Sequence, residues 1–264
     1  MTRQGASKLK QDAGKVKQDT GKLKQEMSKL IHFRLCPFSR AIRIALAELD
    51  IETELVEERP WEWRAELLAL NPAGELPVLQ DDAGHVLCGA YAISEFLGEA
   101  APGEAEAPAA KAEVPPPLAL FPGGREDRAE VRRLVDWFNG KFNREVTQEL
   151  LQEKVYARLQ PGANPHPDAD VLRAIRANLR YHMGYINHLM HQRRWLAGDE
   201  LSFADIAAAA HVSLVDYLGE VPWEEFAAAK VWYARLKSRR SFRALLADRV
   251  PGTLPATHYA DLDF

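Results

Sequence analysis

The stretch Asn71-Pro72-Ala73-Gly74-Glu75-Leu76-Pro77-Val78-Leu79 decides how the rest of the chain is interpreted. Pro72 and Gly74 indicate a turn, because proline and glycine favour turn conformations. Pro77 has no backbone N–H, so we expect it at the first residue of a strand or at a tight turn, where a cis peptide bond can occur. The two apolar residues that follow then form the strand. Taken alone, the stretch is either a ligand-presenting turn or a strand entry without a chemical role.

The bulk composition describes a soluble globular protein. The chain has 264 residues, enough for two ordinary domains, and is 47% hydrophobic and 27% charged. The formal charge is −4, but Met1 to Lys29 holds eight Lys or Arg against three Asp or Glu, so about −9 falls on the remainder. An acidic body of this kind disfavours nucleic acid as a partner.

Cysteine usage and hydropathy exclude further classes. Cys36 and Cys88 are too few for a disulfide framework and lack the other ligands of a zinc site, which fits a reducing cytosol. The eight histidines show no ligand spacing, so we assign no metal. No stretch approaches the roughly 18 uninterrupted apolar residues of a membrane helix, and the N-terminus has no signal-peptide core. We therefore expect no transmembrane segment.

Residues 1–28 form a basic segment with a seven-residue repeat. Leucine or valine recurs at heptad intervals from Leu9 to Leu30, which is the spacing of a coiled-coil seam. Gly14 and Gly21 lie within it, and each costs a helix about 1 kcal/mol. We therefore expect a mobile basic tail, with Met27 as an alternative start of the chain. Its lysines suit an anionic membrane surface or an acidic protein, and composition does not choose between them.

Residues 29–99 alternate between strand and helix patterns. We expect a strand at 30–33, a helix from Pro37, a strand at 54–56, a short helix or turn at 61–70, a strand from 78, a hairpin turn at 81–84, a strand at 85–88 and a helix at 89–99. This order predicts one compact domain that contains both helices and strands.

Cys36 stands at the start of the first expected helix. Pro37 suits the first helical position, which places Cys36 at the N-cap. There the helix dipole favours a thiolate, and Arg40 adds positive charge. A reactive thiol is one interpretation, and a cysteine that only caps the helix is the other. Cys88 ends a strand and is expected in the core.

The second half of the chain follows a change in composition. Residues 100–124 are rich in Ala, Pro and Glu with little to bury, so they predict a linker or surface insertion. Residues 125–249 show long helical patterns and predict an all-helical domain. Ser202 and Asp205 form a capping-box pair, with Leu201 and Ile206 placed as a hydrophobic staple. The alanines that follow at 207–210 predict a buried central helix.

Residues 250–264 form the expected C-terminal tail. Its candidate partner-binding residues interleave apolar and acidic side chains: Tyr259, Asp261, Leu262, Asp263 and Phe264. Disorder is the default for a terminus. The pattern also suits a short docking motif, because the apolar side chains supply anchors while the acids keep the tail soluble.

Three motifs resemble cytosolic glutathione transferases, in the order found in that family: Cys36-Pro37-Phe38-Ser39, residues 71–79, and the capping element at 198–205. The resemblance covers about residues 29–250. It implies an α+β fold with a thioredoxin-like N-terminal domain, an all-helical C-terminal domain and a homodimer. It also implies a glutathione site at which Cys36 falls on the reactive cysteine of the cysteine-type enzymes, Pro77 on the cis-proline and Leu76 on the residue that bonds the ligand's main chain.

The chain departs from that family where the third helix begins. The family holds the γ-glutamyl end of glutathione with an acidic residue followed by serine, and this chain has Gly89 and Ala90 there. Losing two charge-assisted bonds costs about 1.5–3 kcal/mol each. The backbone N–H groups at Ala90 remain. We therefore expect weak or absent glutathione binding and no catalytic residue, with Cys36 as the catalytic residue if the chain is active.

Residues 56–64, 132–138 and 259–264 are similar to a branch of the family that works in bacterial cell division. The resemblance implies a non-catalytic, homodimeric scaffold at the cytoplasmic division site. It would bind FtsZ filaments, promote curved bundles and reach septal wall-synthesis enzymes through its C-terminal tail. Trp61 and Trp63 are the candidate FtsZ contacts, unless one of them packs beneath the domain junction. The alternative function is a glutathione-dependent thiol transferase or reductase that uses Cys36.

Overall fold

The computed structural model describes residues 27–100, 118–160, 162 and 166–262. The N-terminal part is a four-stranded mixed sheet with helices, and the part beyond residue 124 is helical. The predicted α+β fold class is therefore confirmed. The predicted basic repeats before Met27, residues 101–117 of the linker predicted at 100–124, and the last two residues lie outside the described residues.

The sheet has the strand order β2-β1-β3-β4. Its strands are β1 (Lys29–His32), β2 (Glu54–Glu57), β3 (Val78–Gln80) and β4 (Val86–Cys88). β1 runs parallel to β2, with Leu30 opposite Leu55, and antiparallel to β3, with Leu30 opposite Leu79. A parallel pair needs a crossover, and the helix after Cys36 supplies it. The four strands appear where the sequence predicts them.

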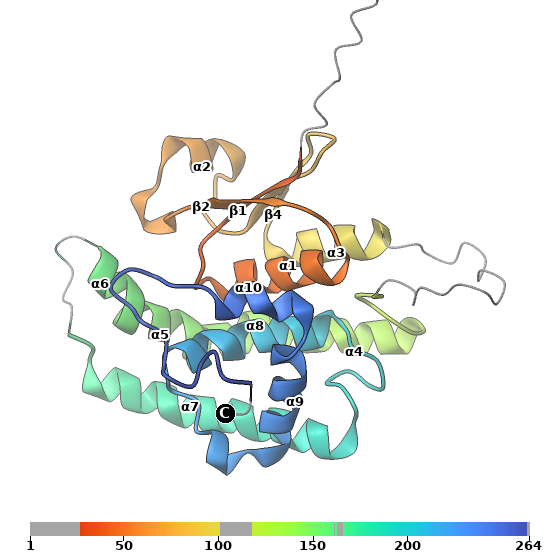
Figure 1. Cartoon of the computed structure of the whole chain (residues 1–264), viewed down its shortest axis with the longest axis vertical. Helices are drawn as coiled ribbons and strands as arrows, with labels where there is room; N and C mark the ends of the chain where they lie inside the picture. The colour runs from red at the N-terminus through yellow and green to blue at the C-terminus, as the bar shows by residue number, and fades with distance from the viewer. Residues whose placement is uncertain (1–26, 101–117, 161, 163–165, 263–264) are drawn as a thin grey trace, which may run out of the picture.

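Helices lie on both faces of this sheet (Figure 1). The N-terminal part contains α1 (Pro37–Glu48), the short 3-10 helix η1 (Pro60–Glu62), α2 (Ala65–Leu70) and α3 (Ala90–Ala100). Pro37 is the first residue of α1 and Cys36 its N-cap, as predicted. Figure 1 shows α1 and α3 between the sheet and the C-terminal helices, with α2 on the opposite face. α1 therefore connects the two domains, and it packs along α8 (Phe203–Tyr217).

The C-terminal domain begins with a long continuous helical segment that alternates between α-helical and π-helical turns. It contains α4 (Arg125–Asp136), the π-helix η2 (Trp137–Thr147), α5 (Gln148–Leu151), the π-helix η3 (Gln152–Tyr156) and α6 (Ala157–Leu159). The predicted inward side chains are all buried: Val131, Leu134, Val135, Phe138, Phe142 and Val146. The sequence pattern gave the buried face correctly but not the π-helical winding. Such π segments are frequent at functional sites.

The remaining helices surround α8. They are α7 (Ala169–Gln192), the 3-10 helix η4 (Trp223–Glu225), α9 (Ala227–Lys237), the 3-10 helix η5 (Arg240–Phe242) and α10 (Arg243–Leu246). Every residue of α8 is buried, which confirms the predicted central helix. The predicted capping box is present, because the Ser202 side chain accepts from the Asp205 backbone N–H and the Asp205 carboxylate accepts from the Ser202 backbone N–H (3.2 Å). The same carboxylate also accepts from the Leu196 backbone N–H (2.8 Å). Burial nevertheless raises the pKa of Asp205 to about 6.

Arg40 ties the two domains together. Its guanidinium is fully buried and donates to the Arg34 carbonyl oxygen (2.8 Å), the Ser213 hydroxyl (2.8 Å) and the Asp248 carboxylate (3.4 Å). Removing one partner from a buried charged network is strongly destabilising, because it leaves a charge without compensation. The sequence predicts Arg40 as a positive charge beside Cys36. In the structure its polar contacts reach the C-terminal domain.

The segment after α10 is not the loose tail that the sequence predicted. Tyr259 is fully buried, its ring lies 5.1 Å from that of Tyr217, and its hydroxyl donates to the Leu245 carbonyl oxygen (3.1 Å). His258 contacts the buried carboxylate of Asp216 at 3.0 Å. The sequence does not predict this packing, because an aromatic residue near a terminus and among acidic residues is expected to be exposed to solvent. Asp261 and Leu262 are exposed.

Candidate functional site

A cleft of about 730 Å³ lies between the two domains. We call it the interdomain cleft and define it by Cys36, Trp63, Leu76, Ala90, Asn143 and Tyr156, which line it together with their neighbours. The N-terminal domain supplies the start of α1, the loop before α2, the turn before β3 and the start of α3. The C-terminal domain supplies η2, α5 and η3. The cleft therefore brings together three features predicted from the sequence: Cys36, the proline stretch at 71–79, and the pair Trp61 and Trp63.

The turn at residues 71–77 is built by Asn71. The side-chain amide of Asn71 donates to the Glu75 carbonyl oxygen (2.9 Å), and its side-chain oxygen accepts from the Ala73 N–H (3.2 Å). Gly74 takes a left-handed conformation at φ 67°, as turns of this kind require. The Leu76–Pro77 peptide bond is cis, which is the isomer that the resemblance implied. Leu76 thus faces the cleft from a closed, hydrogen-bonded loop.

Cys36 is poorly placed for a thiolate. Its side chain is buried, and its thiol lies 3.8 Å from the Leu76 carbonyl oxygen. Burial raises the pKa of this thiol and outweighs the hydrogen bonds from the start of α1 and the charge of Arg40, which lower it. The helix start and Arg40 thus favour a thiolate, as expected, but the burial of the side chain has the larger effect on the pKa. Cys88, the second cysteine, is half-buried at the end of β4.

The residues of the interdomain cleft do not fit glutathione. Glutathione carries two carboxylates and one ammonium group, whereas Glu75 is the single charged side chain among the residues that line the cleft. Gly89 has φ 84° and no side chain, and Ala90 is buried at the start of α3. The cleft offers no cation to either carboxylate. We therefore derive no reaction through glutathione.

Trp61 and Trp63 have different surroundings although they are two residues apart. Trp61 is half-buried, with its ring 5.2 Å from Phe33 and 5.1 Å from Tyr156. Trp63 is 61% exposed, more than any of the other five tryptophans, and it lies at the edge of the cleft. The alternative in which one tryptophan packs beneath the domain junction thus describes Trp61. Trp63 is free to meet a partner.

Glu58, which the sequence does not mark as a site residue, holds the loop that carries both tryptophans. Its buried carboxylate accepts from the Arg59 backbone N–H (2.8 Å) and from Arg64 Nε (3.0 and 3.1 Å). Burial alone would raise the pKa of Glu58, but these hydrogen bonds lower it. The Glu58–Arg64 ion pair closes the loop formed by residues 59–63, so it fixes the position of Trp63 at the protein surface. A glutamate in a charged stretch gives no sequence signal for this role.

A second missed group links the cleft to the helical core. The side-chain oxygen of Asn139 lies 3.2 Å from Nε2 of His211, and the Thr147 hydroxyl lies 3.0 Å from Nδ1 of the same ring. Thr147 in turn contacts the side-chain oxygen of Asn143 at 2.9 Å. Both asparagines line the cleft. The buried histidine therefore orients two amide groups toward the site.

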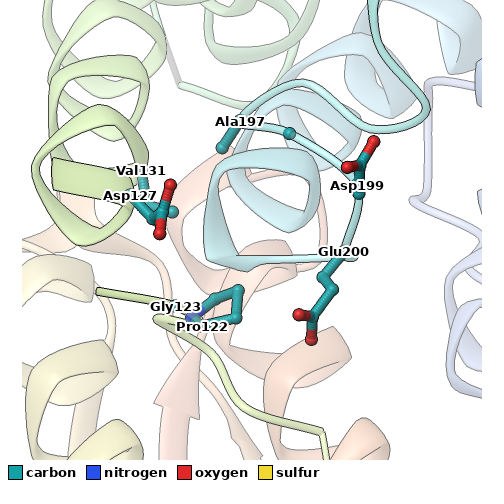
Figure 2. Close-up of a pocket in the computed structure, with 8 residues that line it drawn as sticks. Pro122, Gly123, Asp127, Val131, Ala197, Asp199 and Glu200 are labelled. Atoms are coloured by element: carbon teal, nitrogen blue, oxygen red, sulfur yellow. The ribbon is translucent and has the colours of Figure 1, made fainter. Parts of the chain in front are cut away.

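Not every hollow carries comparable chemistry. A smaller one lies between the start of α4 and the loop before α8, where Asp127, Asp199 and Glu200 are drawn in Figure 2. Their carboxylates do not converge on one point in that view. Within the described ranges, no three His, Cys, Asp or Glu side chains are grouped so that they could hold a metal ion. Among the described helices, none has the length and apolar character needed to cross a membrane.

Comparisons with known proteins agree with this architecture. The glutathione S-transferase N-terminal domain family matches residues 30–105, and the glutathione S-transferase C-terminal domain family matches residues 150–240. FtsZ-localized protein A of Caulobacter vibrioides is 46% identical over 241 residues, which cover 89% of this chain and 97% of the relative.

Solved structures agree as well. A glutathione S-transferase from Rhodospirillum rubrum is 46% identical with a TM-score of 0.82, over 90% of this chain and all of the other. The structure titled FzlA from C. crescentus is 45% identical with a TM-score of 0.80, again over 90% of this chain and 100% of the other.

The fold and the cleft thus define a two-domain protein of the glutathione S-transferase class. The chain belongs to the glutathione S-transferase family and, within it, to the group that contains FtsZ-localized protein A. That relative is named for its localisation with FtsZ and not for an enzymatic activity.

Proposed function

We propose that this protein is a non-catalytic, homodimeric scaffold of the bacterial division machinery that binds FtsZ filaments and gathers them into curved bundles. The observation that carries the proposal is the 46% identity to FtsZ-localized protein A along nearly the whole of both chains. The site supports it, because the interdomain cleft keeps the family's shape while lacking the charged groups that glutathione needs.

Trp63 is the proposed centre of the FtsZ contact. Exposed tryptophans at the edge of an apolar hollow are frequent energetic hot spots of protein interfaces. The Glu58–Arg64 ion pair holds the loop in place before any partner arrives, which reduces the ordering cost of binding. Trp61 supports the same loop from beneath and contributes through packing.

A dimer would explain bundling. Two-fold symmetry presents two copies of one surface, so one particle can bridge two filaments. The exposed end of the chain supplies a second proposed contact, with Asp261 and Leu262 on the surface and Asp263 and Phe264 following them in sequence. We assign to this end the link to septal wall-synthesis enzymes. Because Tyr259 is buried, we assign it no direct docking role but that of an anchor for the segment around it.

Mixing the purified protein with polymerised FtsZ tests the bundling step. Light scattering and negative-stain electron microscopy are expected to report bundles with curved filaments. A chain truncated after Ala260 is expected to bundle as well as the full chain, because the removed residues lie outside the proposed FtsZ contact. Scattering that stays at the level of FtsZ alone, with straight single filaments in the images, would overturn the proposal.

A further inference from the structure

A hollow of about 400 Å³ lies on the side of the domain junction that faces β2, away from the interdomain cleft. We call it the junction hollow and define it by His32, Arg34, Arg43, Glu57, Asp248 and Arg249, which line it with three apolar residues. These side chains come from both domains: β1 and the residues after it, α1, β2, and the segment after α10. Nothing in the proposed scaffold function uses them.

The junction hollow is positively charged within an acidic protein. Three arginines line it against two carboxylates. The Asp248 carboxylate accepts from Arg43 at 2.8 and 3.0 Å and also from Arg40, so two guanidinium groups already compensate it. Glu57 is paired with Arg34 Nε at 3.1 Å. Arg249 then remains as positive charge without a carboxylate among the residues of the hollow.

Buried polar atoms at this hollow lack partners. Among the described residues, neither Nδ1 of His32 nor Nε of Arg43 has a hydrogen-bond partner, although both atoms are buried. Buried donors and acceptors without partners are rare in folded proteins and cost about 1–3 kcal/mol each. Burial, followed by the charge of Arg43, lowers the pKa of His32 to about 4, which agrees with a positive local potential.

The two rim arginines, Arg34 and Arg249, come from separate segments of the chain. Arg34 donates through Nη1 to the Arg249 carbonyl oxygen (3.1 Å), and Arg249 donates through Nη1 to the carbonyl oxygens of Leu246 (3.0 Å) and Asp248 (2.7 Å). These bonds hold both guanidinium groups at the rim and leave Nη2 of each without a partner within the described part of the chain. Donors supplied by separate elements suit a tetrahedral oxyanion better than a planar carboxylate, which a single arginine fork can satisfy.

We propose that the junction hollow is a binding site for a phosphate group, held by Arg34 and Arg249 with His32 and Arg43 at its base. The group is either inorganic phosphate or the phosphate of a small phosphomonoester. Because its ligands belong to both domains, occupancy would stabilise the domain junction. The inference stands on the residues of the hollow and does not depend on the proposed FtsZ scaffold function.

Thermal unfolding of the full chain tests this site. The unfolding midpoint is measured while inorganic phosphate, or glycerol 3-phosphate in a second series, replaces chloride at constant ionic strength. A ligand that binds only the folded state raises the midpoint in a saturable way. Saturation by both probes would identify inorganic phosphate as sufficient, and saturation by the ester alone would identify a phosphomonoester site.

Three variants make the test specific. Arg34→Gln and Arg249→Gln each remove one charge-assisted bond at the rim and should weaken the apparent affinity about tenfold. Arg243→Gln is the matched control, because Arg243 is an exposed arginine of α10 that does not line the hollow. It should respond as wild type does. A midpoint that never saturates with either probe, or equal responses of wild type and both rim variants, would overturn the proposal.

Discussion

The indole ring of Trp63 lies directly over Gly74. A Cβ atom placed on Gly74 would stand only 2.7 Å from Cζ3 of Trp63 and 3.0 Å from Cε3. Trp63 itself has a left-handed backbone at φ 49°, which is uncommon for a bulky residue. The proline turn and the tryptophan loop therefore fit each other, and the absence of a side chain at residue 74 sets where the exposed ring rests.

Gly74→Ala should displace Trp63. The new methyl group collides with the indole, and the left-handed backbone at residue 74 disfavours alanine, so we expect a stability loss of about 1–2 kcal/mol. Tryptophan fluorescence should shift as the Trp63 ring moves. Gly84→Ala is the matched control, since Gly84 is also left-handed but its Cβ would meet no atom within 4 Å. Equal spectra for both variants would contradict the contact.

The thiol of Cys36 should react slowly. Burial raises its pKa, so at pH 7.5 its thiolate fraction is smaller than that of a free cysteine. In a Cys88→Ala background, we expect the reaction with an aromatic disulfide reagent to run at least about tenfold slower than after unfolding. Cys36→Ala should keep its binding to FtsZ polymers. A fast reaction in the folded protein would restore the thiol transferase as the leading function.

The buried His211 should make stability depend on pH. Burial, with a smaller contribution from His182, lowers the pKa of His211 to about 3, whereas an unfolded histidine titrates near 6.5. Between these values the unfolded chain binds the extra proton, so stability falls as pH falls, by about 1.4 kcal/mol per pH unit for this group. Asp205, with its pKa raised to about 6, acts in the opposite direction between about pH 4 and pH 6, where the folded chain binds the extra proton.

A comparison of variants isolates the histidine. Urea unfolding of wild type and His211→Gln at pH 4.5, 5.5 and 6.5 should show a smaller loss of stability at low pH in the variant. The variant is expected to be less stable than wild type near pH 7, because the bonds to Asn139 and Thr147 are disturbed. If the free energy of unfolding changed with pH in the same way for both proteins, His211 would have an ordinary pKa.

Tyr259 should anchor the C-terminal segment. Removing a fully buried aromatic side chain typically costs about 3–5 kcal/mol, so Tyr259→Ala is expected to lower stability by that order and to expose the segment to proteolysis. Leu254→Ala is the control, because Leu254 lies in the same segment and is 81% exposed. If limited proteolysis removed the end of both variants at the wild-type rate, the anchor would be refuted.

Much of the fold could be predicted because local signals agree with the packing. The turn at 71–77 uses proline, glycine and asparagine in positions that their backbone preferences support, and Ser202 with Asp205 marks the start of α8 by its hydrogen-bonding chemistry. Hydrophobic spacing located the buried face of the path from α4 to α6. These features depend on residues close together in sequence.

The unpredicted features depend on contacts between distant residues. Arg40 meets Asp248 across 208 positions, and Tyr259 packs on Tyr217 across the C-terminal domain. Glu58 and Arg64 look like ordinary surface charges until the loop between them is closed. From the sequence alone, a charged residue or an aromatic residue near a terminus is expected to be exposed. Its buried partner lies far away in the sequence and becomes apparent only in the folded structure.

FtsZ co-sedimentation of wild type beside Trp63→Ala tests the central claim most directly. Trp63 is exposed, so its removal should change stability little, whereas Trp61→Ala would also disturb packing. Val231→Ala, which changes an exposed apolar residue of α9, is the control. We predict that wild type and Val231→Ala pellet with FtsZ polymers and that Trp63→Ala binds about tenfold more weakly or worse. A wild-type protein that stays in the supernatant, or a Trp63→Ala binding curve that overlays the wild-type curve, would contradict the account.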